Sequence, residues 1–261
     1  MCIYEVEDKK SIEKLFEGWE ETLIWSCLQD CMGTAYSDDM NNPRSAKIII
    51  GDFCFFAGEP QEELALHKPE RFESDFLIMI PENDKWGELI EKTYGSKARK
   101  YERYAIKKER DVFDKEKLQD IVKNLKAPYE VKMIDENIYN AIKNSDWAGD
   151  LCSQFKDYKD YELRGLGAAV LKNGKIVSGA SSYTVYNEGI EIEIDTRKDE
   201  RRKGLALVCG AKLILECLKR NLYPSWDAQN KESVCLAEKL GYHFDKSYTA
   251  YEVILWPVVI A

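Results

Sequence analysis

Apolar positions early in the chain repeat with the period of an α-helix. They fall at residues 12, 15, 16, 19, 23, 27 and 31, and Gly33 follows them. This spacing predicts an amphipathic helix over residues 11–32 that ends at the glycine. Two further apolar runs, residues 46–58 and 75–81, are bounded by turn residues and are typical of buried strands.

The segments that follow alternate between helix and loop. Residues 84–95 predict a helix between strands, and residues 114–125 predict a charged amphipathic helix. An Ala-Pro pair at 127–128 then interrupts the pattern. We therefore expect two α/β domains, residues 1–126 and residues 127–261.

The second half of the chain gives a clearer α/β pattern. Asn173-Gly174 joins two apolar runs within residues 166–183, and Asn-Gly favours a hairpin because both residues tolerate positive φ. Residues 190–196 alternate strictly between apolar and polar side chains, as a strand with one buried face does. The remaining segments predict a buried helix, a short strand, a second helix and a final strand, at residues 204–221, 222–228, 230–242 and 247–256.

The two halves share a weak internal repeat at an offset of 147 residues. Each copy has a strand, an asparagine (Asn83 or Asn230), a helix with a glycine near its end, and a strand that contains Tyr-x-x-Tyr. This order is typical of a duplicated strand–helix–strand unit, with chance similarity as the alternative. The first copy has no counterpart of the basic loop at residues 201–206, so only the second would keep a ligand site there.

Composition narrows the class of protein. The chain has 261 residues, of which 44% are hydrophobic and 33% charged, and its net charge is −9. This acidic balance disfavours nucleic-acid binding, and the sequence contains neither a secretion signal nor an apolar segment long enough to span a bilayer. We therefore expect a cytoplasmic protein that binds neither nucleic acid nor membranes.

The eight cysteines and two histidines do not form a metal-binding pattern. No two cysteines have the C-x-x-C spacing of zinc sites, so no metal is expected. Cys27 and Cys31 are one helical turn apart, which leaves open a metal or redox pair. Reduced core thiols in a cytosolic protein are the simpler interpretation.

A basic turn stands out in this acidic chain. Residues 196–203 contain five cations, and they lie between the strand at 190–196 and the buried helix that begins at Gly204. The first turn of a helix has free N–H groups and the positive end of the helix dipole, so it binds phosphate readily. Gly204 allows the backbone to approach a ligand closely, and arginine can grip two oxygens at once. The turn therefore predicts a site for a phosphate-bearing ligand.

Two common phosphate-binding motifs do not explain this turn. The sequence has no P-loop pattern of the form G-x-x-x-x-G-K-[ST]. Gly165-Leu166-Gly167 gives part of a dinucleotide fingerprint, but it precedes its strand instead of following one. What remains is the pattern R-x-x-G-x-A at residues 201–206.

The order of four segments resembles the GNAT superfamily of acyl-CoA N-acyltransferases. The segments are IEIEIDT (190–196), RRKGLA (201–206), PSWDAQN (224–230) and N-x-x-S-x-x-L-A-x-K-L-G-Y (230–242). The resemblance covers residues 127–255. A narrower one, to the branch that includes the zwittermicin A resistance acetyltransferase, extends over the N-terminal half. The resemblance implies an α/β fold with a mixed, splayed β-sheet flanked by helices, and an N-terminal α/β lobe that is a candidate degenerate copy.

The resemblance also implies where acetyl-CoA would bind. The acyl-CoA would lie between the strands at 190–196 and 224–228. Its pantetheine arm would bond the backbone of Ile194, Asp195 and Thr196. Its pyrophosphate would rest on the loop residues Arg201, Arg202, Lys203, Gly204, Leu205 and Ala206. Contacts from the opposite side would come from Asn230 and Ser233.

Carboxylates on the strand at 190–196 are the candidates for a catalytic base. Glu191, Glu193 and Asp195 share one face of this strand, next to the position implied for the thioester. Attack on a thioester needs a neutral amine, and a carboxylate can take its proton directly or through water. Glu193 is the first candidate and Glu191 the second, and a β-bulge would change which one points inward. A solvated polar face and a binding site for a cationic substrate are the alternatives.

The acid that would protonate the departing thiolate is harder to assign. Relatives in the superfamily often use a tyrosine in the helix that follows the asparagine, but Ala237 occupies that position here. Tyr248 is the substitute candidate, with aromatic packing of this strand residue as the alternative. Water is a further possible proton source.

We therefore predict an N-acetyltransferase that moves an acetyl group directly from acetyl-CoA to an amine of an unidentified small molecule. An acidic cleft would suit a cationic amine. A non-catalytic CoA-binding sensor or interaction protein is the alternative, and the missing helix tyrosine favours it. Another phosphate-bearing ligand, such as a nucleotide, is a third hypothesis for the same loop.

Overall fold

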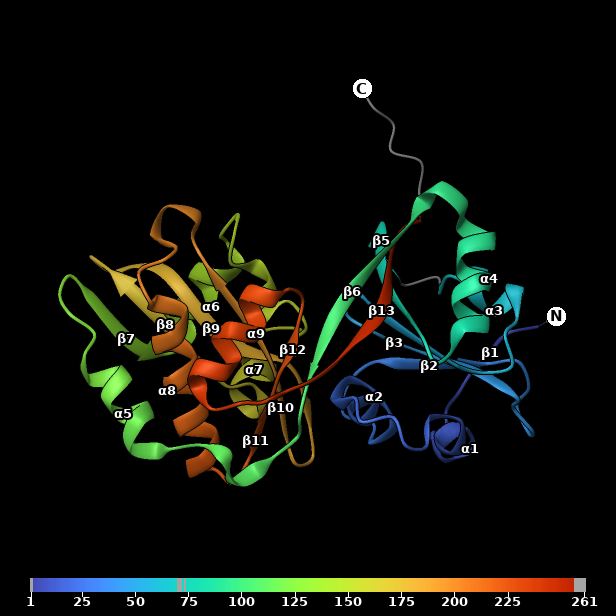
Figure 1. The fold of residues 1–261 in the computed structure, drawn as a ribbon, viewed down its shortest axis with the longest axis horizontal. Coiled ribbons are helices and arrows are strands. Elements are labelled where there is room, and N and C mark those ends of the chain that lie inside the picture. Colours follow the sequence, from blue (N-terminus) through green and yellow to red (C-terminus); the bar gives the residue numbers. More distant parts are fainter. Residues whose placement is uncertain (1, 70–71, 73, 256–261) are drawn as a thin grey trace. The chain divides into compact units, whose positions relative to one another are not determined.

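The computed structural model describes residues 2–69, 72 and 74–255, and its chain divides into two compact units (Figure 1). Unit 1 comprises the chain up to Arg103 and again from Ser247 onward, and unit 2 comprises Tyr104–Lys246. The expected boundary after residue 126 therefore falls inside unit 2. It does so because the helix α5 (Lys115–Lys123) packs against the long helix α8 (Leu205–Lys219) of that unit.

Unit 1 contains a mixed β-sheet with the strand order β1-β2-β3-β4-β5-β13-β6. The strands are β1 (Tyr4–Glu5), β2 (Thr34–Ser37), β3 (Ser45–Ile50), β4 (Phe53–Gly58), β5 (Phe76–Pro81), β6 (Ala98–Ile106) and β13 (Phe244–Ile254). β4 and β5 run parallel, whereas β13 pairs with β5 in the antiparallel sense. The apolar run predicted at 46–58 is a hairpin of β3 and β4, because Gly51 turns the chain with a φ of 55°.

The helices of unit 1 are short, and they correct one prediction. They are α1 (Lys10–Glu13), η1 (Lys14–Phe16), α2 (Thr22–Leu28), α3 (Glu62–Leu66), α4 (Asp84–Tyr94) and η2 (Gly95–Lys97). The single helix predicted over 11–32 is wrong. Gly18 adopts a φ of 78°, and the Glu21 side chain starts a new helix by accepting the Leu23 N–H at 3.4 Å. A left-handed residue followed by a new N-cap divides the apolar pattern into separate helices.

Unit 2 is built on a five-stranded sheet with the order β11-β10-β9-β8-β7. The strands are β7 (Tyr129–Met133), β8 (Gly167–Lys172), β9 (Lys175–Tyr186), β10 (Gly189–Thr196) and β11 (Tyr223–Ser225). All neighbours are antiparallel except β10 and β11, which are parallel. The predicted Asn-Gly hairpin is confirmed: Asn173 and Gly174 have φ of 50° and 74° between β8 and β9.

Helices cover both faces of this sheet (Figure 1). Besides α5 and α8, the helices of unit 2 are η3 (Arg110–Val112), α6 (Glu136–Lys143), η4 (Gly149–Cys152), α7 (Tyr158–Arg164), η5 (Lys198–Glu200) and α9 (Lys231–Leu240). A Cβ at Gly210 of α8 would lie 3.8 Å from Ile194 of β10. A Cβ at Gly179, the β9 partner of Asp195, would lie 2.5 Å from Leu151 of η4. α8 therefore covers the Ile194 face of β10, and η4 covers the opposite face.

The two predicted repeat copies have the same order of elements. Asn83 begins α4 and Asn230 begins α9 with near-identical extended backbone (φ −149° and −154°), and each side chain accepts the N–H three residues further on. The strands after these helices cross between the units. β6 begins in unit 1 and ends in unit 2, where it pairs with the short strand β12 (Asp227–Ala228). β13 runs the other way and pairs with β5 in unit 1.

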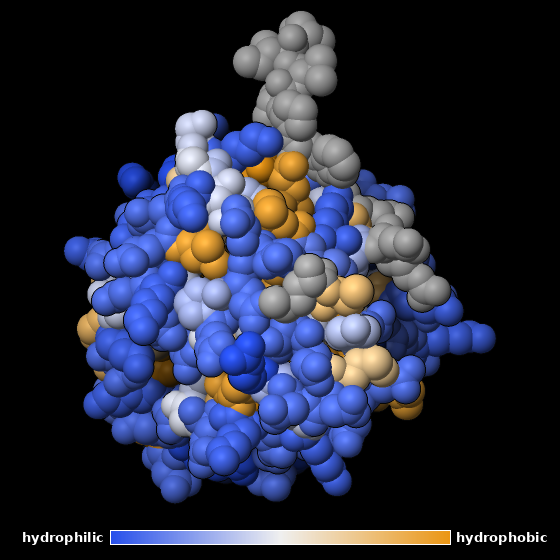
Figure 2. Space-filling view, turned by 90° about the vertical axis from the view of Figure 1, so that its right-hand side faces the viewer, coloured by the Kyte–Doolittle hydropathy of each residue, from blue (hydrophilic) through white to orange (hydrophobic). Residues whose placement is uncertain are grey.

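Most of the face in Figure 2 is hydrophilic, and hydrophobic residues form small separate patches on it. None of the described helices has both the length and the apolar character that a bilayer span requires. Residue 256, which the prediction placed in the last strand, lies outside the described part of the chain.

Candidate functional site

The strands β10 and β11 separate in the middle of unit 2. They pair only from Gly189–Glu191 to Tyr223–Ser225. After Trp226 the chain leaves β10, and Asp227 pairs instead with Ala105 of β6. β10 continues to Thr196, so its last five residues keep only β9 as a neighbour among the described strands. The predicted splay between these two strands is therefore present.

The open edge of β10 presents the backbone of alternate residues. Arg197 donates its N–H to Val177 of β9 (3.0 Å), and the Asp195 carbonyl accepts the Ser178 hydroxyl (3.1 Å). Odd-numbered residues here thus bond toward β9. Because backbone groups alternate along a strand, Ile194 directs its N–H and C=O toward the splay. Of the predicted pantetheine partners, Ile194 has the suitable orientation, whereas the backbone of Asp195 is turned away.

Trp226 marks the point at which β11 ends. Its side chain is only 2% exposed, its ring lies 5.6 Å from that of Tyr242, and its indole N–H donates to Ser233 Oγ (3.1 Å). Asn230 accepts the Ser233 N–H (2.9 Å) as the cap of α9. Asn230 thus caps α9 and Ser233 bonds Trp226 at the end of β11, and the contact of both residues with a cofactor stays a prediction.

The basic loop leads from β10 to the start of α8. Gly204 is the N-cap of α8 and has a φ of 78°, and Arg202 also adopts positive φ, at 62°. The first intrahelical bond runs from Val208 N–H to the Gly204 carbonyl (3.2 Å), so the N–H groups of Leu205 and Ala206 precede it. A Cβ at Gly204 would meet nothing within 4 Å. The helix start is thus open, and its N–H groups can donate hydrogen bonds to an anion.

The three loop cations have different surroundings. Arg201 is 61% exposed; its Nε donates to the Thr196 carbonyl (3.0 Å), and Nη2 lies 3.5 Å from Asp195 Oδ1. Arg202 is exposed, and its side chain forms no ion pair or hydrogen bond with the rest of the described chain. Lys203 donates to Glu200 Oε2 (2.7 Å) and to the Asp199 carbonyl (3.2 Å). Arg202 is therefore the cation most available to a ligand.

Glu200 is a buried carboxylate at the centre of this loop. The sequence did not predict it as a site residue. Its side chain is 3% exposed, and its partners are Lys172, Lys203, the Tyr129 hydroxyl and Arg197. Hydrogen bonds from Lys172, Lys203 and Tyr129 lower the pKa of Glu200 to about 2. Asp199 and Glu200 are the two acidic residues within this run of cations, and such a pattern suggests ion pairs within the loop.

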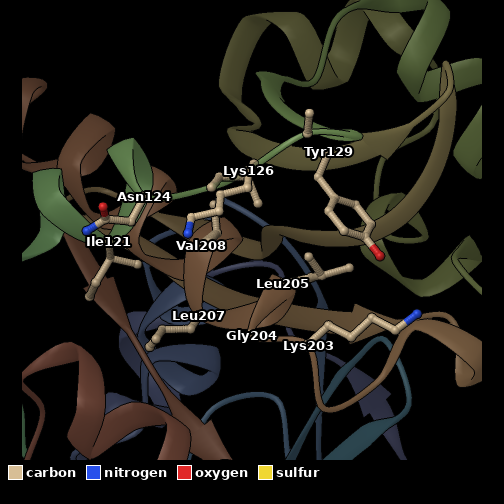
Figure 3. Close-up of a pocket in the computed structure, with 11 residues that line it drawn as sticks. Ile121, Asn124, Lys126, Tyr129, Lys203, Gly204, Leu205, Leu207 and Val208 are labelled. Carbon is tan, nitrogen blue, oxygen red and sulfur yellow. The ribbon is translucent and has the colours of Figure 1, made fainter.

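A pocket of about 470 Å³ lies beside the loop (Figure 3). Its walls come from the end of α5, the segment from Asn124 to Tyr129, and the residues from Lys203 to Val208. In Figure 3 the Tyr129 hydroxyl and the Lys203 ammonium point toward the same side, which agrees with their common partner Glu200. The start of α8 therefore has a concave wall next to it. This wall is formed by the end of α5 and the segment from Asn124 to Tyr129, which lie outside the basic loop.

The carboxylates of β10 lie on the sheet face opposite α8. Glu193 pairs with Ser181 of β9, whose hydroxyl bonds the Tyr161 hydroxyl of α7 (2.9 Å). A register shift occurs between Glu191 and Ile192, where Tyr183 of β9 is the extra residue. The bulge thus lies on the neighbouring strand, and the alternation of β10 itself is kept. The three acidic side chains share one face, as predicted.

Glu191 and Glu193 differ in burial. Glu191 is 4% exposed, whereas Glu193 is partly exposed. Burial raises the pKa of Tyr223 to about 12, and the charge of Glu191 contributes to this rise. The pKa of Tyr242 is also raised, mainly by burial and in part by Glu191. Glu191 therefore lies in a closed, tyrosine-rich environment, and Glu193 is the more accessible carboxylate.

The candidate acid and the cysteines lie elsewhere. Tyr248 belongs to unit 1, where its hydroxyl accepts Arg103 Nε (3.3 Å), and its role as a general acid stays a prediction. Ala237 is fully buried in α9. Burial raises the pKa of the Cys27 thiol to about 12. Within the described ranges, no three His, Cys, Asp or Glu residues come together in a metal-binding group.

Comparisons with known proteins agree with this architecture. A family model described as GNAT acetyltransferase matches residues 13–251. The chain is 27% identical over 271 residues to the Uncharacterized N-acetyltransferase YdfB of Bacillus subtilis (strain 168), covering 95% of this chain and 98% of that protein. It shares 44% identity and a TM-score of 0.88 with the crystal structure of a GCN5-related N-acetyltransferase-like protein from Streptococcus suis 89/1591, over 95% and 98% of the two chains.

A more distant comparison concerns the fold alone. A tandem GNAT protein from the clavulanic acid biosynthesis pathway is 8% identical, with a TM-score of 0.56 over 98% of this chain and 99% of that one. Together these structures confirm the predicted mixed α/β fold with GNAT-like sheets flanked by helices.

Proposed function

This chain belongs to the GNAT acetyltransferase family, and we propose that it moves an acetyl group from acetyl-CoA directly to an amine of a small molecule. The observation that supports this most is the combination, within unit 2, of a splayed strand edge with an open helix start. The Ile194 backbone faces the splay, and the N–H groups of Leu205 and Ala206 begin α8.

The residues around the loop suit the chemistry of acyl-CoA. The space beside Gly204, which a Cβ would occupy without a clash, leaves room for phosphate oxygens against the backbone N–H groups. Arg202 would add positive charge, and Arg201 would contribute one side of its guanidinium while the other bonds Thr196. The Ile194 backbone would hold the amide groups of the pantetheine arm. When bound, acetyl-CoA supplies the activated acyl group.

The carboxylates of β10 would prepare the acceptor. Glu193 takes the proton from the attacking amine, directly or through water, because it is more accessible than the buried Glu191. As the new C–N bond formed and the C–S bond broke, the leaving thiolate would take up a proton from water. No covalent step on a cysteine is invoked, since Cys152 and Cys209 are buried and burial raises the pKa of each thiol to about 12.

The acceptor would be a cationic amine. Glu193 and Asp195, the partly exposed carboxylates of β10, would give this face a negative charge, which attracts an ammonium group before it is deprotonated. The narrower resemblance to the zwittermicin A resistance branch supports an antibiotic amine as one class to test. A panel of amines with acetyl-CoA, followed by release of free CoA thiol, tests this proposal. Absence of thiol release with all amines would favour the alternative below.

A non-catalytic CoA-binding protein is the alternative. The buried Ala237 supports it, because this position provides no hydroxyl to protonate a thiolate. Glu193→Gln separates the two functions. An enzyme would lose turnover and keep acetyl-CoA binding, whereas a sensor would show no turnover in either form.

A further inference from the structure

Glu200 connects the basic loop to strands β7 and β8 of the unit 2 sheet. Tyr129 of β7 and Lys172 of β8 are cross-strand partners, and the Lys172 ammonium lies 5.5 Å from the centre of the Tyr129 ring. Both side chains donate to Glu200, the hydroxyl to Oε2 and the ammonium to Oε1, each at 2.7 Å. One carboxylate thus joins two strands to the loop that precedes α8.

The same carboxylate holds two cations of the loop itself. Lys203 donates to Oε2 at 2.7 Å, and Arg197 Nη2 lies 3.7 Å from Oε1. Lys203 donates a second hydrogen bond to the Asp199 carbonyl. A buried carboxylate is stable only when its oxygens are well paired, and here each oxygen has two partners. The loop therefore has a fixed anchor at Glu200 and not only the flexible ends of surface side chains.

We propose that Glu200 is a positioning residue for acyl-CoA binding: it fixes the segment from Arg197 to Gly204 on β7 and β8, and it directs the Lys203 ammonium toward itself and away from ligand phosphates. This inference rests on the proposed function. Phosphate is then held mainly by the α8 backbone and Arg202, and Lys203 acts through the shape of the loop. Hydrogen bonds from Lys172, Lys203 and Tyr129 lower the pKa of Glu200 to about 2. This pKa lies far below neutral pH, so the carboxylate is ionised there.

Charge and position make opposite predictions for this residue. A negative charge near a phosphate site repels the ligand, so a purely electrostatic role means that removing the charge tightens binding. A positioning role means that acetyl-CoA binding weakens whenever the side chain no longer accepts the hydrogen bonds of Tyr129, Lys172 and Lys203. Glu200→Asp keeps the charge and shortens the side chain by one methylene, and so separates the two effects. Asp199→Glu is the matched control, since Asp199 is 65% exposed in the same loop and keeps its charge.

Two measurements on the whole protein test the proposal. The first is the Kd of acetyl-CoA by titration calorimetry. We expect Glu200→Asp to raise Kd about tenfold, or about 1.4 kcal/mol, and Glu200→Gln to raise it as well, while Asp199→Glu stays within about twofold of the wild type. The second is hydrogen exchange of residues 197–208 in the free protein, which should be faster in Glu200→Asp.

The outcomes separate this inference from the proposed function. An unchanged Kd in Glu200→Asp, tighter binding in Glu200→Gln, or unchanged exchange of the loop overturns the positioning role. If the wild type itself fails to bind acetyl-CoA, the proposed function fails, and loop exchange in the free protein still decides whether Glu200 holds the loop. Tyr129→Phe, which removes one hydrogen bond and leaves both lysines, should raise Kd and loop exchange by a smaller factor; no change in either would contradict the network.

The role of Lys203 has its own readout. A cation that touches phosphate directly makes binding depend on salt, because ions screen the contact. Arg202→Met should therefore weaken binding and reduce the dependence of Kd on salt concentration. Lys203→Met should weaken binding through the loop and leave that dependence as in the wild type. The reverse pattern would show that Lys203 is the phosphate contact and would overturn this part of the inference.

Discussion

Glu191 of β10 and Ser225 of β11 are the last paired residues of the parallel ladder in unit 2. The corresponding ladder in unit 1 runs further: Phe56 pairs with Pro81, and Glu82 donates its N–H to the Phe56 carbonyl (3.0 Å). The last paired residue precedes the capping asparagine by two positions in unit 1 (Asn83) and by five in unit 2 (Asn230). The two predicted repeat copies thus differ at the place where a splay can open.

We predict that one acetyl-CoA binds per chain, in unit 2. In unit 1 the equivalent strand end is closed by the protein's own groups: Gly58 donates to Glu82 Oε2 and accepts the Trp86 indole N–H, both at 2.9 Å. Titration calorimetry with acetyl-CoA should give a stoichiometry of one. A stoichiometry of two would contradict this account of unit 1.

Gly204→Val should abolish acetyl-CoA binding without unfolding the protein. The substitution has space in the free protein, but valine at a φ of 78° is strained by about 1–2 kcal/mol, and its side chain would cover the N–H groups of α8. Gly174→Val is the matched control, because Gly174 has a φ of 74° and equally open surroundings in the β8–β9 turn. Both variants should lose similar stability by thermal melting. Equal acetyl-CoA affinity in the two would rule out this placement of the site.

Glu193→Gln should lower kcat by about 100-fold or more and leave acetyl-CoA affinity near that of the wild type, because the amide cannot accept the proton of the amine. Thiol release with an accepted amine measures the first quantity, and calorimetry the second. Asp195→Asn is the comparison on the same strand face, and it should reduce kcat much less. A larger loss of kcat in Asp195→Asn than in Glu193→Gln would show that Glu193 is not the base.

Lys47→Met should stabilise the protein near neutral pH. Lys47 is 1% exposed in β3, its ammonium donates to the His67 carbonyl, and burial lowers its pKa from 10.5 to about 8. Below pH 8 the ammonium is charged in both states, so its burial costs up to about 3 kcal/mol of unfolding free energy. Between pH 8 and 10.5 the unfolded chain binds more protons, so stability from this residue rises with pH.

Thermal melting at pH 7 and pH 9.5 checks this prediction. The wild type should gain stability relative to Lys47→Met as the pH rises, and the difference between them should be largest at pH 7. Lys85→Met, at an exposed position of α4, is the control and should change little at either pH. A destabilised Lys47→Met at pH 7 would mean that the ammonium is worth more to the fold than its desolvation costs.

Local sequence patterns predicted the parts of the site that depend on neighbouring residues. The strand at 190–196, the basic turn and the Asn230 cap are all present, because alternation, free helix N–H groups and side-chain capping act within a few residues. The broken first helix was missed because Gly18 adopts positive φ inside a helical apolar pattern.

Long-range relationships were beyond such patterns. Tyr129 and Lys172 contact Glu200 only once β7, β8 and the loop have come together in the fold. The residues next to Glu200 in the sequence do not indicate these two partners. The observed domain boundary also differs from the predicted one, because β6 and β13 cross between the units. A break in the pattern at Ala127 does not indicate which sheet a later strand joins.

The most direct test of acetyl-CoA binding in unit 2 is the melting temperature of the wild-type protein with and without acetyl-CoA. At about 100 times its Kd, a ligand that binds only the folded state adds about 2.7 kcal/mol, which raises the melting temperature by several degrees in a chain of this size. We predict this rise for the wild type and none for Gly204→Val. No rise with millimolar acetyl-CoA, CoA or longer acyl-CoAs would contradict the account.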